Sequence, residues 1–321
     1  MKRALITGIA GQDGTYLSQF LLDRDYEVFG IINPNSSNKS DSTKKPLSSV
    51  IIHECDITDF ESIEDILCDI KPDEIYHLAS SVEPRVINNQ ELSIFDLNFT
   101  PGVHILNVVK NFLPNTKIYF AGSSLMFGET LDLFQSELTP MRPNTPYGIA
   151  KVALYNFMKM YREVYGVFAC MGILYNHESP IRKEKFLPRK ITKSAAKIKI
   201  GKQSELILGD LAISRDWSYA GDIVKSMFLM LDQTEPKDYV VGSGILHTPE
   251  DILNIAFNEV NLDWRQYVKT DRNLFRSVEY TKLCADTTKI RNDLQWNTSM
   301  TFKEIIVSMV KEDMRLEDQN D

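Results

Sequence analysis

The sequence predicts an α/β protein: a doubly wound parallel sheet of the Rossmann type with a smaller α/β substrate-binding lobe. Three observations support this. Short apolar runs alternate with helical patterns up to about residue 175, a glycine-rich turn follows the first run, and beyond 175 the elements are shorter and the loops more charged. We therefore expect domains at 1–175 and 176–321, with some of the second crossing back to the first.

The first region alternates strands and helices in the order that βαβ units require. Parallel strands need crossover helices, so helices should cover both faces of the sheet. Strands are expected at 3–7, 27–32, 50–53, 74–79, 117–121 and 167–174, and helices at 14–22, 60–69, 90–109 and 146–165.

The second region has helical patterns separated by polar loops. Helices are expected at 186–200, 222–231, 249–259 and 301–312, and a strand at 204–208. The acidic tail EDMRLEDQND is expected to fray.

Composition narrows the function classes. A net charge of −8 argues against a general binder of nucleic acid or anionic membranes. The four cysteines are far apart in sequence and form no metal or redox motif. There is no secretory signal pattern and no run of the roughly 18 apolar residues that a membrane span needs, so the cytoplasm is the expected location.

The stretch ALITGIAGQDG places Gly8, Gly11 and Gly14 in a G-x-x-G-x-x-G spacing between a strand and a helix. Glycines in this context allow a tight turn and close approach of a pyrophosphate to backbone N–H groups at the helix N-terminus. This predicts a dinucleotide site. At the end of the third strand, Asp56 is expected to accept a hydrogen bond from the adenine amino group.

The residues after the second strand do not decide between NAD and NADP. An acid there would bind the ribose diol of NAD and an arginine would favour NADP, but the sequence has Ile31, Ile32 and Asn33. The following loop offers groups that could meet a 2′-phosphate or simply be solvated: Ser36, Ser37, Lys39, Lys44 and Lys45.

The stretch TPYGIAK places Tyr147 and Lys151 four residues apart, on one face of a predicted helix. A nearby ammonium and the nicotinamide charge would lower the pKa of the tyrosine and make it a usable acid or base. Ser123, in AGSSLMFG at the end of the fifth strand, completes a predicted catalytic set. Alternatively, the tyrosine is packed at a helix start and the lysine is solvated.

Together these motifs resemble the short-chain dehydrogenase/reductase superfamily in its extended form. YGIAKVALYNFMKMYREVYG, GILYNHESPIRKEKFLPRKIT, LGDLAISRDWSYAGDIV and FRSVEY are similar to the branch of GDP-mannose 4,6-dehydratases and GDP-4-keto-6-deoxy-mannose reductases. The resemblance covers nearly the whole chain. It implies an enzyme that uses NADP(H) or NAD(H) on a GDP-sugar, as a homodimer through the helices at 90–109 and 146–165, or a homotetramer.

Cofactor contacts are then expected at Gly8, Gly11, Gln12, Asp13, Gly14, Asn33, Asp56, Ile57, Leu78, Ala79, Tyr147 and Lys151. Substrate contacts are expected at Ser81, Ser124, Leu125, Asn176, Arg182, Lys190, Arg215, Arg276 and Glu279. Arginine suits a diphosphate because its planar fork donates two hydrogen bonds.

One departure from the dehydratases bears on mechanism. Where they carry a glutamate, two positions after the catalytic hydroxyl, this chain has Leu125. That glutamate serves elimination of the C6 hydroxyl, and leucine cannot transfer a proton. Asn33 and Pro34 also replace arginines that contact the 2′-phosphate, and Ser81-Val82-Glu83 replaces Gln-Ser-His. Glu83 and Glu129 are candidate displaced acids.

The sequence therefore predicts an NAD(P)H-dependent 4-reductase of a GDP-4-keto-6-deoxy hexose or heptose. Hydride would reach C4, Tyr147 would protonate the oxygen, and Leu125 with Met126 would pack against C5 and C6. The alternatives are a divergent GDP-mannose 4,6-dehydratase, a GDP-sugar C4 oxidoreductase or epimerase, and a non-catalytic GDP-sugar-binding paralogue. The intact Ser-Tyr-Lys set argues against the last.

Overall fold

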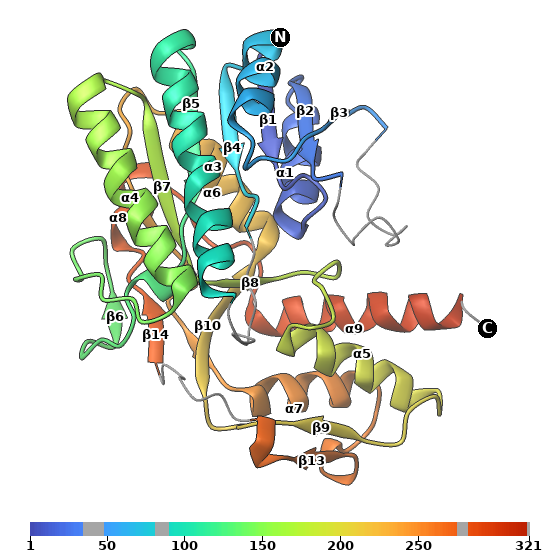
Figure 1. Ribbon diagram of the computed structural model, residues 1–321. Coiled ribbons are helices and arrows are strands. Elements are labelled where there is room, and N and C mark those ends of the chain that lie inside the picture. The colour runs from blue at the N-terminus through green and yellow to red at the C-terminus, as the bar shows by residue number, and fades with distance from the viewer. Residues whose placement is uncertain (35–47, 81–89, 275–281, 320–321) are drawn as a thin grey trace.

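The computed structural model describes residues 1–34, 48–80, 90–274 and 282–319 (Figure 1). Seven of the described strands form one parallel sheet in the order β11-β7-β5-β4-β1-β2-β3. These strands are β1 (Arg3–Thr7), β2 (Glu27–Ile32), β3 (Ile51–Glu54), β4 (Glu74–His77), β5 (Lys117–Ala121), β7 (Ala169–Leu174) and β11 (Tyr239–Val241). The predicted doubly wound α/β fold is confirmed.

Helices cover both faces of this sheet because its strands are apolar on both sides. One core contains side chains of α1 (Gln12–Leu22), α6 (Ala220–Leu231) and α8 (Thr288–Leu294). The opposite core contains side chains of α2 (Phe60–Ile70), α3 (Glu91–Phe112) and α4 (Pro146–Tyr165). The parallel strands therefore end at a common carboxyl edge, where ligands bind in such folds.

The rest of the chain builds a second layer below that edge (Figure 1). A mixed sheet joins β12 (Leu246–His247), β10 (Ser214–Tyr219), β14 (Lys282–Ala285) and β6 (Phe134–Gln135), and β8 (Asn176–Glu178) pairs with β10. β9 (Leu206–Leu208) pairs with β13 (Val268–Thr270). A third core lies among α5 (Leu187–Lys199), α7 (Pro249–Glu259) and α9 (Phe302–Asp318).

Both regions exchange elements with each other. β11 and α6 belong to the second half of the sequence but lie in or on the large sheet, whereas β6 comes from the first half and joins the smaller one. The division at residue 175 stays a prediction.

The acidic tail does not fray as predicted. α9 continues to Asp318, and within it Asp313 and Glu317 are buried. Arg189 of α5 pairs with Asp313 at 2.8 Å, and Lys202 lies 3.6 Å from Glu317. The sequence pattern missed this because the cations that pair with Asp313 and Glu317 lie more than a hundred residues away. No helix in the described part of the chain is long and apolar enough to cross a membrane.

Candidate functional site

The glycine-rich turn joins β1 to α1 as predicted, although the helix begins at Gln12 rather than Gly14. Gly8 has φ +75°, and a Cβ there would lie 2.8 Å from the backbone nitrogen of Ala79. A Cβ on Gly14 would lie 2.6 Å from the Gly8 oxygen. The N-cap, Gly11, supplies no side-chain cap to the helix. The turn therefore leaves open backbone N–H groups at a helix N-terminus, which suit a diphosphate.

The other predicted cofactor residues follow neighbouring strands at the same edge. Asn33 follows β2, Asp56 and Ile57 follow β3, and Leu78 with Ala79 follows β4. Asp56 Oδ1 accepts hydrogen bonds from the Thr58 backbone N–H at 3.0 Å and from its hydroxyl at 2.8 Å. That carboxylate is thus held in one orientation beside the sheet edge, as an adenine contact would need.

The predicted proton-transfer set is brought together at the end of β5. Ser123 caps the short 3₁₀ helix η3 (Ser124–Met126), with its Oγ accepting from Leu125 N at 3.2 Å. α4 packs on η3 so closely that a Cβ on Gly148 would lie 2.6 Å from the Leu125 oxygen. This contact places Tyr147 in hydrogen-bonding reach of Ser123.

Burial governs the protonation of this set. It raises the pKa of Tyr147, while hydrogen bonding with Ser80 and Ser123 opposes the rise. The sequence analysis expected a lowered pKa for Tyr147. In the protein without cofactor the pKa is raised instead, because the effect of desolvation is larger than that of the neighbouring hydroxyl groups. Lys151 Nζ lies 5.7 Å from the Tyr147 ring centroid, and burial lowers the pKa of Lys151 to about 8.

His77 was missed by the sequence analysis. It ends β4, is fully buried, and its Nδ1 lies 2.9 Å from Thr7 Oγ1. Burial, and secondarily the charge of Lys151, lowers the pKa of His77 to about 3, so the ring is neutral. The only sequence signal was its place directly before Leu78-Ala79 at a strand end.

Leu125 and Met126 differ in where their side chains lie. Leu125 is partly buried and packs against a cluster that includes Phe127 and Tyr175. Met126 is fully buried in the core beneath α3 and α4. The expectation that both contact the sugar is wrong for Met126, because its side chain fills the protein interior.

Of the predicted substrate residues, Asn176 and Arg182 lie on and just after β8, and Ser124 is a nearly buried residue of η3. The Arg182 guanidinium lies 3.3 Å from Glu178 and 3.6 Å above the Phe186 ring. Burial raises the pKa of Glu178, and Arg182 opposes that rise. Burial raises the pKa of Tyr147 and outweighs the charge of Arg182, which lowers it.

Lys190 and Arg215 lie on other elements of the second layer. Lys190, on α5, donates to the Ile207 carbonyl at 2.7 Å, and Arg215, on β10, donates to the Ser214 carbonyl at 2.8 Å. Glu129, one candidate displaced acid, is exposed. Several predicted residues lie outside the described part of the chain: Ser36, Ser37, Lys39, Lys44, Lys45, Ser81, Glu83, Arg276 and Glu279.

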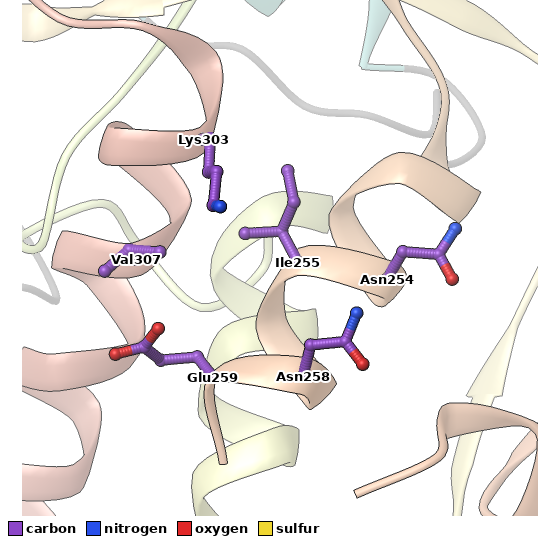
Figure 2. A pocket seen from close by; sticks show the side chains of 6 residues that line it. All are labelled: Asn254, Ile255, Asn258, Glu259, Lys303 and Val307. Carbon is purple, nitrogen blue, oxygen red and sulfur yellow. The ribbon is translucent and has the colours of Figure 1, made fainter. Parts of the chain in front are cut away.

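A separate groove of about 410 Å³ runs between α7 and α9 (Figure 2). Its lining contains no predicted site residue; it consists of Asn254, Ile255, Asn258, Glu259, Lys303 and Val307. The candidate site is therefore the carboxyl edge of the large sheet together with β8 and β10.

A Rossmann-type sheet, a glycine-rich turn and a Ser-Tyr-Lys set at the end of β5 define an extended short-chain dehydrogenase/reductase. A family model for GDP-mannose 4,6 dehydratase matches residues 5–309. GDP-mannose 4,6 dehydratase 2 of Arabidopsis thaliana is 41% identical, over 98% of this chain and 87% of its own. This chain belongs to the GDP-mannose 4,6-dehydratase family.

Solved structures agree with the fold at much lower identity. The dTDP-glucose 4,6-dehydratase of Bacillus anthracis, in complex with NAD, has a TM-score of 0.84 at 17% identity and covers 99% of this chain and 98% of its own. RMD of Pseudomonas aeruginosa, complexed with NADPH, has a TM-score of 0.82 at 17% identity and covers 98% of this chain and 100% of its own.

These comparisons confirm the predicted family, fold class and enzyme class, and they agree with the predicted NAD(P) cofactor. They do not confirm a 4-reductase. The relatives are dehydratases by name, so the dehydratase alternative fits better than the leading prediction.

Proposed function

We propose that the protein performs NAD(P)-dependent chemistry at C4 of a GDP-linked hexose, and that 4,6-dehydration of GDP-mannose is its reaction. The similarity to named dehydratases along nearly the whole chain carries this proposal. The glycine-rich turn, which has no room for a Cβ at Gly8 or Gly14 and leaves the helix N-terminus without a side-chain cap, supports a dinucleotide there. The turn would hold a nicotinamide dinucleotide, and the chemistry that this group would supply is reversible hydride transfer.

The chain's own residues would manage the proton at the C4 oxygen. Tyr147 would take that proton as the carbonyl forms, and Ser123 would hydrogen bond to the same oxygen. The buried Lys151 would hold the nicotinamide ribose and favour the ionised form of Tyr147. At the other end of the substrate, Asn176, Arg182, Lys190 and Arg215 are proposed to hold the GDP moiety.

Elimination of the C6 hydroxyl also requires an acid, and Leu125 cannot serve. Glu83 and Glu129 are the proposed replacements. If either acts, the double variant Glu83→Gln/Glu129→Gln should lose dehydration of GDP-mannose and still bind GDP. An unaffected double variant would reject both residues.

Leu125 favours a second candidate, the 4-reductase. Without an acid at this position the site retains every group needed for hydride transfer at C4, but not the group that expels the C6 hydroxyl. A GDP-4-keto-6-deoxy sugar would then be the substrate and would be reduced at C4.

One incubation series separates the candidates. The protein receives GDP-mannose with NADP⁺ or NAD⁺, and in parallel a GDP-4-keto-6-deoxy sugar with NADPH or NADH; products are analysed by mass spectrometry and NMR. Loss of one water from GDP-mannose without net cofactor change supports the dehydratase. Cofactor oxidation that depends on the keto sugar, with no turnover of GDP-mannose, supports the reductase. An isomeric product supports an epimerase.

We also propose a homodimer through α3 and α4. Apolar side chains are exposed along both helices, including Leu92, Leu97, Phe112, Phe157 and Val164. Sedimentation of the wild type and of Phe157→Asp would test this, with dissociation expected for the variant. Association into a tetramer and the cytoplasmic location stay predictions.

A further inference from the structure

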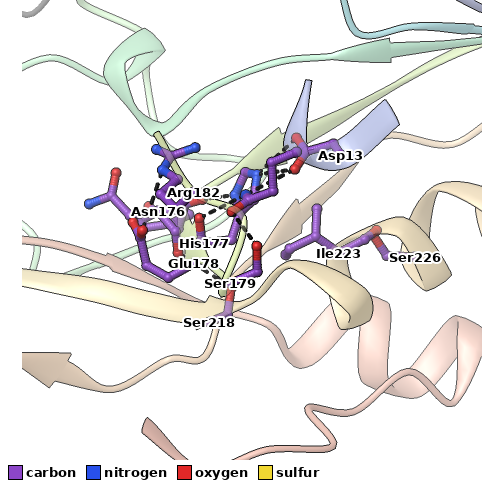
Figure 3. A network of polar contacts seen from close by, with 11 residues as sticks. Asp13, Asn176, His177, Glu178, Ser179, Arg182, Ser218, Ile223 and Ser226 are labelled. Atoms are coloured by element: carbon purple, nitrogen blue, oxygen red, sulfur yellow. Dashed lines mark hydrogen bonds and ion pairs between the residues drawn. The ribbon is translucent and has the colours of Figure 1, made fainter. Parts of the chain in front are cut away.

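Asp13 lies in the first turn of α1, but its partner comes from the second layer. Its Oδ1 and Oδ2 lie 3.0 and 2.9 Å from His177 Nε2, across 164 residues of sequence. Figure 3 shows Asp13 directed at His177 on β8. Only 21% and 11% of the two side chains are accessible. The contact therefore joins the glycine-rich turn to the strand that carries Asn176.

His177 is held as an imidazolium by its two partners. Its Nδ1 lies 2.8 Å from the Tyr175 carbonyl oxygen, which can only accept a hydrogen bond. Its Nε2 faces an ionised carboxylate, which also only accepts. Both ring nitrogens must therefore donate. Burial lowers the pKa of His177, but Asp13 raises it above the ordinary value.

Gln12 makes a second connection beside the first. Its Nε2 donates to the His177 carbonyl at 3.2 Å, and its Oε1 accepts from Ser179 Oγ at 2.7 Å. The Ser179 carbonyl in turn accepts from the Arg182 backbone N–H at 3.0 Å. Two consecutive residues of the dinucleotide turn thus contact His177 and Ser179 in the segment that ends at Arg182.

The Asp13–His177 ion pair has an electrostatic role at the N-terminus of α1. A carboxylate in the first turn of α1 would repel a diphosphate bound at the same helix N-terminus. His177 neutralises it inside the protein. A diphosphate at the turn would also fix the backbone of Gln12 and Asp13, and the ordering would pass to β8 through the contacts above. A second ligand that needs β8 ordered would then lose less entropy on binding.

We propose that Gln12, Asp13, His177 and Ser179 couple the two binding sites, so that a dinucleotide at the glycine-rich turn preorganises Asn176 and Arg182 for the GDP-sugar. Asp13 and His177 are positioning residues in this scheme. The inference rests on the proposed function for the identity of the two ligands. Because coupling is reciprocal, GDP must tighten dinucleotide binding by the same factor.

Two measurements on the full-length protein test this. Hydrogen–deuterium exchange of the segment 176–182 should slow when NADPH alone is added. Calorimetry should show GDP binding at least about fivefold more tightly at saturating NADPH, within the usual range of coupling between sites. Asp13→Asn and His177→Gln should each lose both effects, and the double variant should be no worse than the singles.

Asp313→Asn is the matched control, because Asp313 is also a buried ion-pair partner in the second layer but belongs to α9. It should retain the coupling. Equal GDP affinity with and without NADPH in the wild type, or coupling that survives in Asp13→Asn, would overturn the proposal. Independent binding of the two ligands leaves the proposed function standing, whereas failure to bind GDP under any condition rejects both.

Discussion

The carboxyl edge of the large sheet and the second layer hold their functional side chains in different ways. At the edge, Gly8, Ser123 and Tyr147 are placed by turns and helix caps made by residues close to them in sequence. In the second layer, Asp216 beside Arg215 accepts hydrogen bonds from Ser243, Gly244 and Ala285, all from distant segments. The turn and cap conformations at the edge are thus locally encoded, whereas a buried charge of the second layer depends on hydrogen bonds from distant segments.

The largest effect should follow from a change at the locally encoded edge. Tyr147→Phe removes the phenolic proton without altering the helix that carries it, so turnover should fall by about a hundredfold or more. Thermal stability should stay near that of the wild type. Initial rates with the substrate identified by the incubation series provide the measurement. Wild-type turnover in this variant would show that the Ser-Tyr-Lys set is not the reacting centre.

A second change tests whether the turn is as constrained as its geometry indicates. Gly8→Ala places a Cβ 2.8 Å from backbone at positive φ, and we expect a loss of about 4 kcal/mol in unfolding free energy. Gly166→Ala is the matched control: it has φ +69° but no neighbour within 4 Å, so about 1 kcal/mol should be lost. Equal losses in urea titrations would mean that only the dihedral angle matters at Gly8.

The same difference explains what the sequence could and could not predict. The glycine spacing, the helix start at Pro146 and the strand ends are short-range patterns, so six of the seven strands of the large sheet and the Ser123–Tyr147 approach were predictable. The seventh, β11, comes from the second half of the chain and was not predicted. The strands β8, β10 and β14 were not predicted because they pair only where distant segments meet. His177 was not predicted as a partner of Asp13 because nothing in NHESP specifies which carboxylate lies opposite. The helix expected at 301–312 was correct, but its continuation to Asp318 was missed because the tail is acidic.

The second layer offers a pH test of its buried charges. Burial raises the pKa of Asp313 to about 6 despite Arg189 and Thr192, which lower it. A raised pKa means that the folded state binds the proton more tightly than the unfolded state, where the value is about 3.9. This contribution to stability is therefore complete at low pH and is lost as pH rises through about 6.

Asp313→Asn should remove that dependence. The shift of about two units corresponds to roughly 3 kcal/mol, so the wild type should lose up to about that much relative to the variant as pH rises from about 4 to 7. Urea unfolding at a series of pH values provides the comparison. Parallel pH profiles for the two proteins would show that Asp313 is already ionised when folded at low pH, with Arg189 outweighing burial.

The smallest expected effect falls where the two regions meet and bears most directly on the reaction. Leu125→Glu supplies a carboxyl group two positions after Ser123, next to Phe127, and Leu125→Gln supplies the same shape without a transferable proton. If Leu125 is what limits elimination, the glutamate variant should dehydrate GDP-mannose about tenfold faster than the glutamine variant. This is less than the full gain from a well-placed acid.

Both variants should lose about 1–3 kcal/mol of stability, because a polar group enters a partly apolar cluster. Equal rates in the two variants, with an active wild type, would place the eliminating acid elsewhere. If the wild type and both variants all fail to dehydrate GDP-mannose, the site lacks more than one group for elimination. That result would favour the 4-reductase over the dehydratase.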